Sequence, residues 1–311
     1  MSSTNELKGV ASSLDPSIYS LEGEELAFVQ KLTGISDEEE LKNHIISVQT
    51  KAYAVYGYPC IRAFAFLRMR MFRSHAYQVA FKLREVRENP ILLDIGCCFG
   101  NDVRKAVDDG WPVEDIVASD LRQEFWDAGH ELFKSSPETF PAAFVPGDAF
   151  DDLFLAPNNL EDLKSLVDGT PNSSSVDRPN LRELKSLNPL RGKLSVVHAS
   201  SFFHLFEEEK QRNLAWRLAA LLIPKPGSVI FGRHIATPEV GIRRFARRGQ
   251  SREMFCHSPL SWKQLWGKEI FGAAGIKAIV TAHLIDISEY RKDIEEEEKP
   301  IWLMKWSVVL A

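Results

Sequence analysis

Three aspartates in this chain each follow a short apolar run, and their side chains could bind one polar ligand. Asp94 stands near the end of ILLDIG, Asp120 ends DIVASD, and Asp148 follows AAFVPG. Each carboxylate taken alone could instead cap a turn or a helix. Three in chain order, at the ends of three consecutive β-rich runs, indicate one site, because open α/β sheets bind ligands at the carboxyl ends of their strands.

The loop ILLDIGCCFGND indicates which ligand that site takes. Its glycines, Gly96 and Gly100, would let a ligand approach the backbone closely. A pyrophosphate would require small residues here, but the loop has Cys98 and Phe99 and begins with the acidic Asp94. Such a loop suits a ligand that is cationic or zwitterionic at this place. S-adenosylmethionine is such a ligand, since its ammonium group can pair with an acid or with backbone carbonyls.

The two later aspartates fit the rest of that cofactor. Asp120 lies twenty residues beyond Gly100, where an acidic side chain binds ribose hydroxyls in this class of fold. Asp148 could accept a hydrogen bond from the adenine amino group. The full set of cofactor-binding residues that we predict is Asp94, Gly96, Cys97, Gly100, Asp102, Asp120, Leu121, Asp148, Ala149, His198 and Ala199.

Composition excludes several other classes of protein. The 311 residues carry a formal net charge of −5, so there is no overall basic field to bind nucleic acid or an anionic membrane. The four cysteines, Cys60, Cys97, Cys98 and Cys256, form no C-x-x-C pair, so we expect neither a metal site nor disulfides. No signal peptide or membrane-length apolar run is present. We expect a soluble cytoplasmic protein, with a homodimer as one open assembly.

The amino-terminal part of the chain has a helical pattern without strands. The helical stretches that we predict there are 21–32, 36–57 with Ser36 as N-cap, 59–72 and 74–86. We assign residues 1–88 to a helical cap that covers a substrate, and residues 89–311 to a cofactor-binding domain.

Residues 89–311 alternate short strands with helices. Further helices are expected at 101–109, 123–134 and 207–222, and from Pro259 with Ser258 as N-cap. The seven strands that we predict are ILLDIG, DIVASD, AAFVPGD, KLSVVHAS, GSVIFGRHI, IKAIVTAHLIDI and PIWLMKWSVVLA. The polar segments 168–180 and 288–299 are predicted to be a mobile surface loop and a solvated hairpin connection. The fold class is therefore an α/β, doubly wound sheet.

Polar and aromatic residues elsewhere are candidates for binding the second substrate. His204, after the fourth strand, could orient an acceptor or take its proton, although its aromatic neighbours could equally be core residues. Arg62 and Arg233 could each bind a carboxylate through two hydrogen bonds, or form an ordinary salt bridge. We predict that these three residues are catalytic. The predicted substrate-binding residues are Tyr56, Tyr58, Phe203, His257 and Trp262.

Four motifs resemble class I S-adenosylmethionine-dependent methyltransferases, and within them the fungal enzymes that methylate carboxylates of meroterpenoid precursors. The motifs are YGYPCIRAFAFL, LLDIGCCFGNDVRKAVDDG, VVHASSFFHLFEEEKQ and GSVIFGRHIA. The family pattern D-x-G-C-x-x-G is matched from Asp94 to Gly100, with Cys98 where a small residue is common. The resemblance extends from about residue 50 to the end. It implies an antiparallel last strand, an N-terminal helical cap and the cofactor roles given above.

The sequence thus predicts an O-methyltransferase that forms a methyl ester on a small fungal metabolite. A carboxylate acceptor needs little acid–base help, whereas a phenol, with a pKa near ~10, would need a base such as His204. Two other classes stay open, an NAD-dependent oxidoreductase and a non-catalytic cofactor-binding protein.

Overall fold

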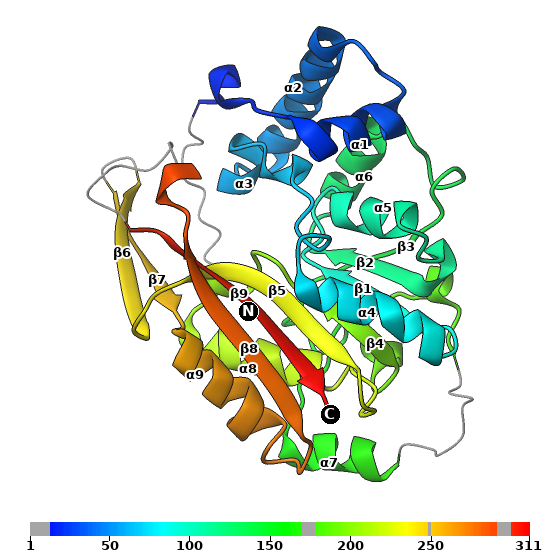
Figure 1. Ribbon diagram of the computed structural model, residues 1–311, viewed down its shortest axis with the longest axis vertical. Coiled ribbons are helices and arrows are strands. Elements are labelled where there is room, and N and C mark those ends of the chain that lie inside the picture. The colour runs from blue at the N-terminus through cyan, green and yellow to red at the C-terminus, as the bar shows by residue number, and fades with distance from the viewer. Residues whose placement is uncertain (1–12, 170–177, 248–249, 291–299) are drawn as a thin grey trace.

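A seven-stranded sheet forms the centre of the molecule (Figure 1). The computed structural model describes residues 13–169, 178–247, 250–290 and 300–311. The sheet strands are β1 (Ile91–Ile95), β2 (Ile116–Asp120), β3 (Ala143–Pro146), β4 (Leu194–His198), β5 (Val229–Ala236), β8 (Ala278–Asp286) and β9 (Trp302–Leu310). Their order is β3-β2-β1-β4-β5-β9-β8, with the first five parallel and β9 antiparallel to both neighbours. The predicted doubly wound fold with an antiparallel last strand is confirmed.

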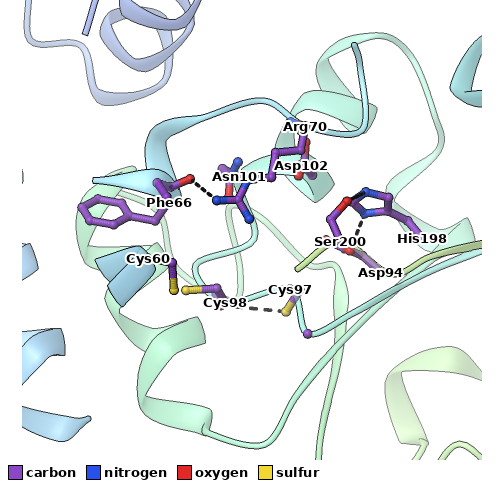
Figure 2. A pocket seen from close by; sticks show the side chains of 12 residues that line it. Cys60, Phe66, Arg70, Asp94, Cys97, Cys98, Asn101, Asp102, His198 and Ser200 are labelled. Carbon is purple, nitrogen blue, oxygen red and sulfur yellow. Dashed lines mark hydrogen bonds and ion pairs between the residues drawn. The ribbon is translucent and has the colours of Figure 1, made fainter. Parts of the chain in front are cut away.

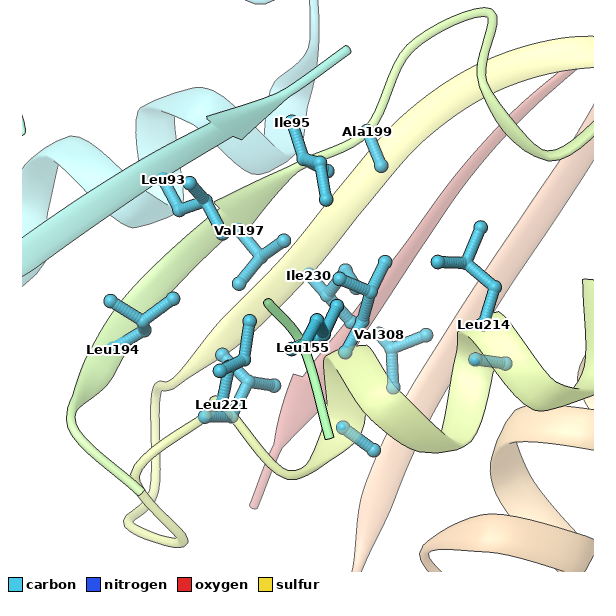
Figure 3. Packing of buried hydrophobic residues seen from close by; sticks show 14 of the residues in the cluster. Leu93, Ile95, Leu155, Leu194, Val197, Ala199, Leu214, Leu221, Ile230 and Val308 are labelled. Carbon is cyan, nitrogen blue, oxygen red and sulfur yellow. The ribbon is translucent and has the colours of Figure 1, made fainter. Parts of the chain in front are cut away.

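Helices cover both faces of this sheet, because its strands are apolar on both sides. In β1, Leu93 and Ile95 face one layer and Leu92 faces the other. The helices packed on the first face include α7 (Leu160–Asp168), α8 (Glu208–Ala219) and α9 (Pro259–Gln264), while α4 (His75–Val86) and α5 (Asn101–Asp108) lie on the second. Figure 3 shows part of the first layer, where Leu214 of α8 belongs to the same buried cluster as Ile230 and Val308 of the sheet.

The amino-terminal helices share their core with the cofactor loop. They are α1 (Gly23–Thr33), α2 (Glu38–Val55) and α3 (Pro59–Arg62). Phe28 and Ile45 belong to one buried cluster with Phe99, from the loop after β1, and with Phe125 of α6 (Gln123–Leu132). Helix α4, which we assigned to the cap, packs on the sheet instead. The boundary at residue 88 therefore marks a change in the sequence pattern, but residues from both sides of it pack in the same buried clusters.

Two local predictions in the cap were wrong. The N-cap of α2 is Asp37 and not Ser36, because the Asp37 carboxylate accepts the Glu40 N–H at 2.8 Å. The helix predicted over 59–72 ends at Arg62, and Phe64 then has a left-handed backbone with φ of 53°. A short 3-10 turn and an irregular stretch follow, so residues 65–71 can cross over the loop after β1.

The hairpin of β6 (Gly241–Arg247) and β7 (Gln250–Cys256) and the helix α7 were not predicted. Five arginines interrupt the apolar pattern between residues 241 and 256, which hid the hairpin. Of the two predicted polar segments, 170–177 and 291–299 lie outside the described residues. Among the helices that the structure describes, none has the length and apolar character needed to cross a bilayer.

An aromatic cluster beside α9 buries two histidines. Ser258 and Pro259 start this helix as predicted, and Ser258 accepts the Ser261 N–H at 3.2 Å. His234 of β5 accepts a hydrogen bond from the Trp306 indole at 3.0 Å. Burial lowers the pKa of His257 to about 4 and, with the nearby His204 and His257, lowers that of His234 well below its ordinary value. Both rings are therefore neutral in the folded protein at pH 7.

Because these two histidines are held neutral in the folded protein, we expect the free energy of unfolding to decrease in acid. Below pH ~6.5 the unfolded chain binds protons at these rings and the folded chain does not, so unfolding is favoured as pH falls toward 4. For His257 the loss approaches about 3 kcal/mol at pH 4. Urea unfolding at pH 7, 5.5 and 4.5 should show this decline in the free energy of unfolding, and His257→Gln should flatten it. The exposed His283 provides the control, and an equal flattening by His283→Gln would contradict the assignment.

Candidate active site

Asp120 holds the loop after β1 and keeps acceptor capacity for a ligand. Its Oδ2 accepts the Cys98 N–H at 2.9 Å, and its Oδ1 accepts the Arg122 N–H at 3.2 Å. A carboxylate has about four lone-pair sites, so each oxygen can accept one more hydrogen bond. Burial raises the pKa of Asp120, and the backbone N–H donors act in the opposite direction. The predicted pairing with two ribose hydroxyls is chemically open to this side chain.

The two loop glycines are required by the protein's own packing. Gly96 has a φ of 71°, and a Cβ there would lie 3.0 Å from the ring of Phe202. Gly100 has a φ of 69°, and its Cβ would lie 2.4 Å from the Trp126 ring. The sequence suggested that these glycines make room for a ligand. The structure shows that larger residues are already excluded by backbone conformation and neighbouring rings.

The bulky part of the loop is divided between core and pocket. Phe99 is fully buried, with its ring centroid 4.6 Å from that of Phe66. Cys98 faces the pocket and Cys97 is buried. Burial raises the pKa of both thiols well above its ordinary value, which keeps them protonated and unreactive. Within the described residues, no group of His, Cys, Asp and Glu is arranged to hold a metal ion.

A pocket lies between this loop, the end of β4 and the segment that follows α3 (Figure 2). It brings together several predicted cofactor residues, namely Asp94, Gly96, Cys97, Asp102 and His198. The other residues that line it are Cys60, Ala65, Phe66, Arg70, Cys98, Asn101 and Ser200. Arg70 was missed because the sequence placed it inside a regular helix. The polar side chains from three separate segments converge here as a ligand site requires.

Inside the pocket, Asp94, His198 and Ser200 form a chain of hydrogen bonds (Figure 2). Asp94 Oδ1 lies 2.7 Å from His198 Nδ1, and His198 Nε2 lies 2.7 Å from Ser200 Oγ. Asp94 and His198 are 3% and 2% exposed, so water does not compete for these bonds. His198 therefore links two strand ends, which the sequence could not show.

Asp102 and Asn101, at the start of α5, anchor the segment that covers the loop. Asp102 Oδ1 accepts the backbone N–H groups of Arg70 at 2.7 Å and Met71 at 2.8 Å. Asn101 donates its side-chain N–H to the Arg68 carbonyl at 2.6 Å. Burial raises the pKa of the Asp102 carboxyl, while the nearby His198 acts to lower it. Asp102 was predicted to contact the cofactor, but its carboxylate already binds backbone N–H groups of the protein.

Two arginines lie beside the pocket, and only one has partners. Arg70 donates to the Ser201 hydroxyl at 2.9 Å and to the Ala65 carbonyl at 3.2 Å. The Arg233 guanidinium has no hydrogen bond or ion pair within the described residues, although the Arg233 backbone carbonyl accepts the Ser201 N–H. Burial lowers the pKa of Arg233 to about 9, with the positive charge of Arg70 adding to the effect. Arg233 thus remains a cation whose donors can receive an anion.

All three predicted catalytic residues lie outside the pocket lining, but Arg233 is close enough to the lining residue Arg70 to be affected by its charge. Hydrogen bonds from Ser17 lower the pKa of Asp15, and the charge of Arg62, at the end of α3, adds to this effect. The Arg62 carbonyl accepts from Gln49 at 3.0 Å. His204 is half-buried in the 3-10 turn Phe203–Leu205. The structure therefore separates Arg62 from Arg233, which the sequence treated as equivalent.

Tyr56 and Tyr58 lie on the side of Asp120 and not on that of Arg233. The Arg122 guanidinium lies 4.7 Å from the Tyr56 ring centroid, and the two tyrosine rings are 4.3 Å apart. Burial, together with the charge of Asp120, raises the pKa of Tyr58 to about 12. Both rings were predicted to bind substrate, but this placement favours contact with the nucleoside end of the cofactor. Leu121 beside them is 55% exposed, as an apolar cofactor contact would be.

The remaining cofactor candidates differ in how far they can reach a ligand. Asp148 is half-buried, and its Oδ1 accepts the Phe150 N–H at 2.9 Å, which leaves its other oxygen without this partner. The side chains of Ala149 and Ala199 belong to the core on the first face of the sheet. They can offer only backbone groups to a cofactor.

Three predicted substrate residues belong to the aromatic core. Phe203 and Trp262 have no exposed surface, and their ring centroids are 4.9 Å apart. His257 packs on Trp262 at 5.1 Å, and its Nδ1 lies 2.9 Å from the Ser261 hydroxyl. The rings are enclosed by neighbours such as Trp306, so we do not retain these residues as substrate contacts.

Known proteins match the cap and, separately, most of the chain. A family model described as "Meroterpenoid methyltransferase N-terminal domain" matches residues 14–67. Among solved structures, the DhpI–S-adenosylhomocysteine complex aligns over 87% of this chain and 97% of that chain, at 13% identity and a TM-score of 0.39. That similarity is too low to support an argument, and the fold assignment depends on the strand order described above.

Fungal sequences are much closer. Methyltransferase trt5 of Aspergillus terreus is 27% identical over 78% of this chain and 74% of its own length. O-methyltransferase atr3 of Stereocaulon alpinum is 32% identical over 79% of this chain, and the match spans 61% of atr3. O-methyltransferase phiE, from a fungal species, is 31% identical over 82% of this chain and 74% of phiE. At this identity and coverage, the chain belongs to the family of fungal S-adenosylmethionine-dependent methyltransferases.

Proposed function

We propose that this protein forms a methyl ester on a carboxylate of a small fungal metabolite, with S-adenosylmethionine as the donor. The observation that carries the proposal is the half-buried Arg233 guanidinium, which lies beside the cofactor pocket and has no ion pair within the described residues. A cation that is partly removed from water is costly unless it is paired, so a site that keeps one unpaired is suited to an anionic ligand. A carboxylate is the anion that a guanidinium binds best through two hydrogen bonds.

The strand order supports a direction for the bound cofactor. Along the neighbouring strands β3, β2, β1 and β4, Asp148, Asp120, Asp94 and Ser200 lie at or near the carboxyl ends, and Arg233 lies within β5, two residues beyond the residue that pairs with His198 at the end of β4. The acidic side chains come first and the arginine last. Adenine would lie at Asp148, the ribose hydroxyls at Asp120, and the amino-acid end in the pocket at Asp94. The acceptor would then meet the methyl group on the side of β5.

The pocket fits the amino-acid end of the cofactor in charge as well as in place. Asp94 and Ser200 provide hydrogen-bond acceptors, as an ammonium group requires, and Arg70, which lines the same pocket, provides donors, as a carboxylate requires. Arg70 keeps its Nε without a hydrogen-bond partner among the described residues. A zwitterionic group therefore matches the chemistry of both walls.

The protein's task in the reaction is mainly to position the acceptor. When bound, the sulfonium cofactor supplies a methyl group that is already activated toward nucleophiles. Arg233 would hold the acceptor carboxylate so that one oxygen lies in line with the methyl carbon, about 3 Å away. The segment of residues 65–71, fixed by Asp102, would cover the pocket and exclude water. A carboxylate has no proton to lose, so no general base is needed.

The comparisons bear on the alternatives. Membership in a methyltransferase family replaces the NAD-dependent oxidoreductase reading. The family model that matches residues 14–67 is named for meroterpenoid methyltransferases, which supports an acceptor of that class. The competing methyl acceptor is a phenol, with His204 as the base. The product distinguishes the two acceptors, because a carboxylate gives a methyl ester and a phenol gives a methyl ether.

The first prediction from this site concerns cofactor binding. Asp120→Ala should weaken binding of S-adenosylhomocysteine by about 1.5–3 kcal/mol, because charge-assisted hydrogen bonds to two hydroxyls are lost. Isothermal titration calorimetry measures this loss, with thermal melting to detect damage to the loop. Asp127→Ala is the matched control, because Asp127 is an exposed aspartate on α6. Wild-type affinity in Asp120→Ala would remove this residue from the site.

The second prediction concerns the acceptor. Arg233→Met should reduce kcat/KM by roughly 10–100-fold on aromatic acids, because the charged partner of the carboxylate is lost. Arg62→Met and His204→Gln should cost less, and the wild-type rate should show no requirement for an imidazole base between pH 5 and 9. The substrates are aromatic carboxylic acids paired with matching phenols. Radiolabelled product should release methanol in alkali, as esters do and ethers do not.

Two results would oppose this reading. If only His204→Gln abolishes turnover, and the rate rises through a pKa near ~6.5, the product is a phenolic ether. Alkali-stable label would lead to the same conclusion. Loss of the fold is checked by melting, where Arg233→Met should be no less stable than the wild type, because its charge has no partner to lose.

A further inference from the structure

The hydrogen bonds from Asp94 through His198 to Ser200 do more than join two strands. Asp94 and His198 are already partners in the parallel register of β1 and β4. Backbone hydrogen bonds therefore hold the strand ends together without these side chains. The chain continues beyond the sheet to Ser200, whose hydroxyl is half-buried at the pocket wall (Figure 2).

The direction of these bonds decides what Ser200 offers to a ligand. A carboxylate can only accept, so His198 Nδ1 must donate its proton to Asp94. In the neutral ring, Nε2 then carries a lone pair and can only accept. With His198 neutral and its proton on Nδ1, Ser200 donates its single proton to Nε2 across 2.7 Å. Its oxygen is left with lone pairs toward the pocket, and linked hydrogen bonds of this kind strengthen the oxygen as an acceptor.

A hydroxyl oxygen that accepts hydrogen bonds and is linked through His198 to the Asp94 carboxylate is suited to bind a cation. The pocket that Ser200 lines also contains Asp94, and Arg70 lies among the same lining residues as the only arginine. One part of the pocket thus accepts hydrogen bonds and another donates them. A free α-amino acid group, with ammonium and carboxylate on one carbon, has this pattern of charges.

We propose that Ser200 binds the α-ammonium group of the cofactor, and that His198 and Asp94 are positioning residues that fix the Ser200 hydroxyl as an acceptor. The inference rests on the cofactor direction given under the proposed function, and it deepens that proposal. It also changes the role that the sequence suggested for Asp94. One of its oxygens reaches the ligand site only through His198 and Ser200.

The test compares two cofactor fragments by isothermal titration calorimetry. S-adenosylhomocysteine has the amino-acid group, and methylthioadenosine lacks it but keeps the nucleoside and sulfur. Ser200→Ala should weaken S-adenosylhomocysteine binding roughly tenfold, the usual size of one charge-assisted hydrogen bond. The same variant should change methylthioadenosine binding less than about twofold, because the lost contact is absent from that ligand. Ser195→Ala, a buried serine of β4 outside the pocket lining, should change neither.

His198→Asn tests the positioning role. The amide keeps a donor for Asp94 but loses the nitrogen that orients Ser200. It should cause the same selective loss as Ser200→Ala, and the double variant should be no worse than either single one, because both remove one contact. Equal losses for the two ligands would show a structural role and overturn the proposal. Additive losses would overturn the positioning role of His198.

Other outcomes are separable from a failure of the proposed function. If the wild type binds neither fragment, the cofactor placement itself is wrong. The inference alone fails when wild-type binding is normal and Ser200→Ala is either silent or weakens both ligands equally. The same three side chains could also activate a serine as a nucleophile. Mass spectrometry after treatment with a fluorophosphonate tests this, and a covalent adduct at Ser200 would overturn the acceptor role. We expect no adduct.

Discussion

The buried carboxylate of Asp102 is the interaction on which the candidate site depends. It accepts two consecutive backbone N–H groups, of Arg70 and Met71, from a segment without regular secondary structure. Asp102 lies in the first turn of α5, where a negative charge is favourable. The same helix begins at the cofactor loop. One side chain thus fixes the distance between the loop and the covering segment, and with it the place of the Arg70 guanidinium.

With Arg70 held in this place, the acidic and the basic residues of the site lie at different positions along the carboxyl edge of the sheet. Acidic residues stand at β1 and β2, whereas Arg70 lies close enough to Arg233 for its charge to lower the pKa of Arg233. A cationic donor on the acidic side and an anionic acceptor on the basic side would each meet favourable charge. They would also attract one another across the position of the methyl group, at distances where Coulomb energies in a partly buried site are several kcal/mol. Placement and electrostatics then act in the same direction.

The sequence was sufficient for the parts of this arrangement that depend on periodicity. The strands were visible because each is an apolar run of the expected length, and Asp120 could be placed because it ends such a run. Arg70 could not be placed, because its position follows from the left-handed Phe64 and from a side chain 32 residues further along. Phe203 and Trp262 were misassigned for a related reason. Aromatic residues next to a site have the same sequence pattern as aromatic residues in it, and only packing separates them.

A comparison of the buried Arg104 with the half-buried Arg233 shows why Arg233 is the informative residue. Burial lowers the pKa of both Arg104 and Arg233 to about 9. Arg104 is compensated, since its guanidinium lies 4.4–5.2 Å from the ring centroids of three aromatic residues and donates to the Phe99 carbonyl at 3.1 Å. The Arg233 guanidinium has no hydrogen bond and no aromatic contact within the described residues, and only the charges of Asp102 and Glu25 act in its favour. The protein thus provides direct partners for Arg104 and leaves the donors of Arg233 open. The missing partner is therefore best supplied by the acceptor.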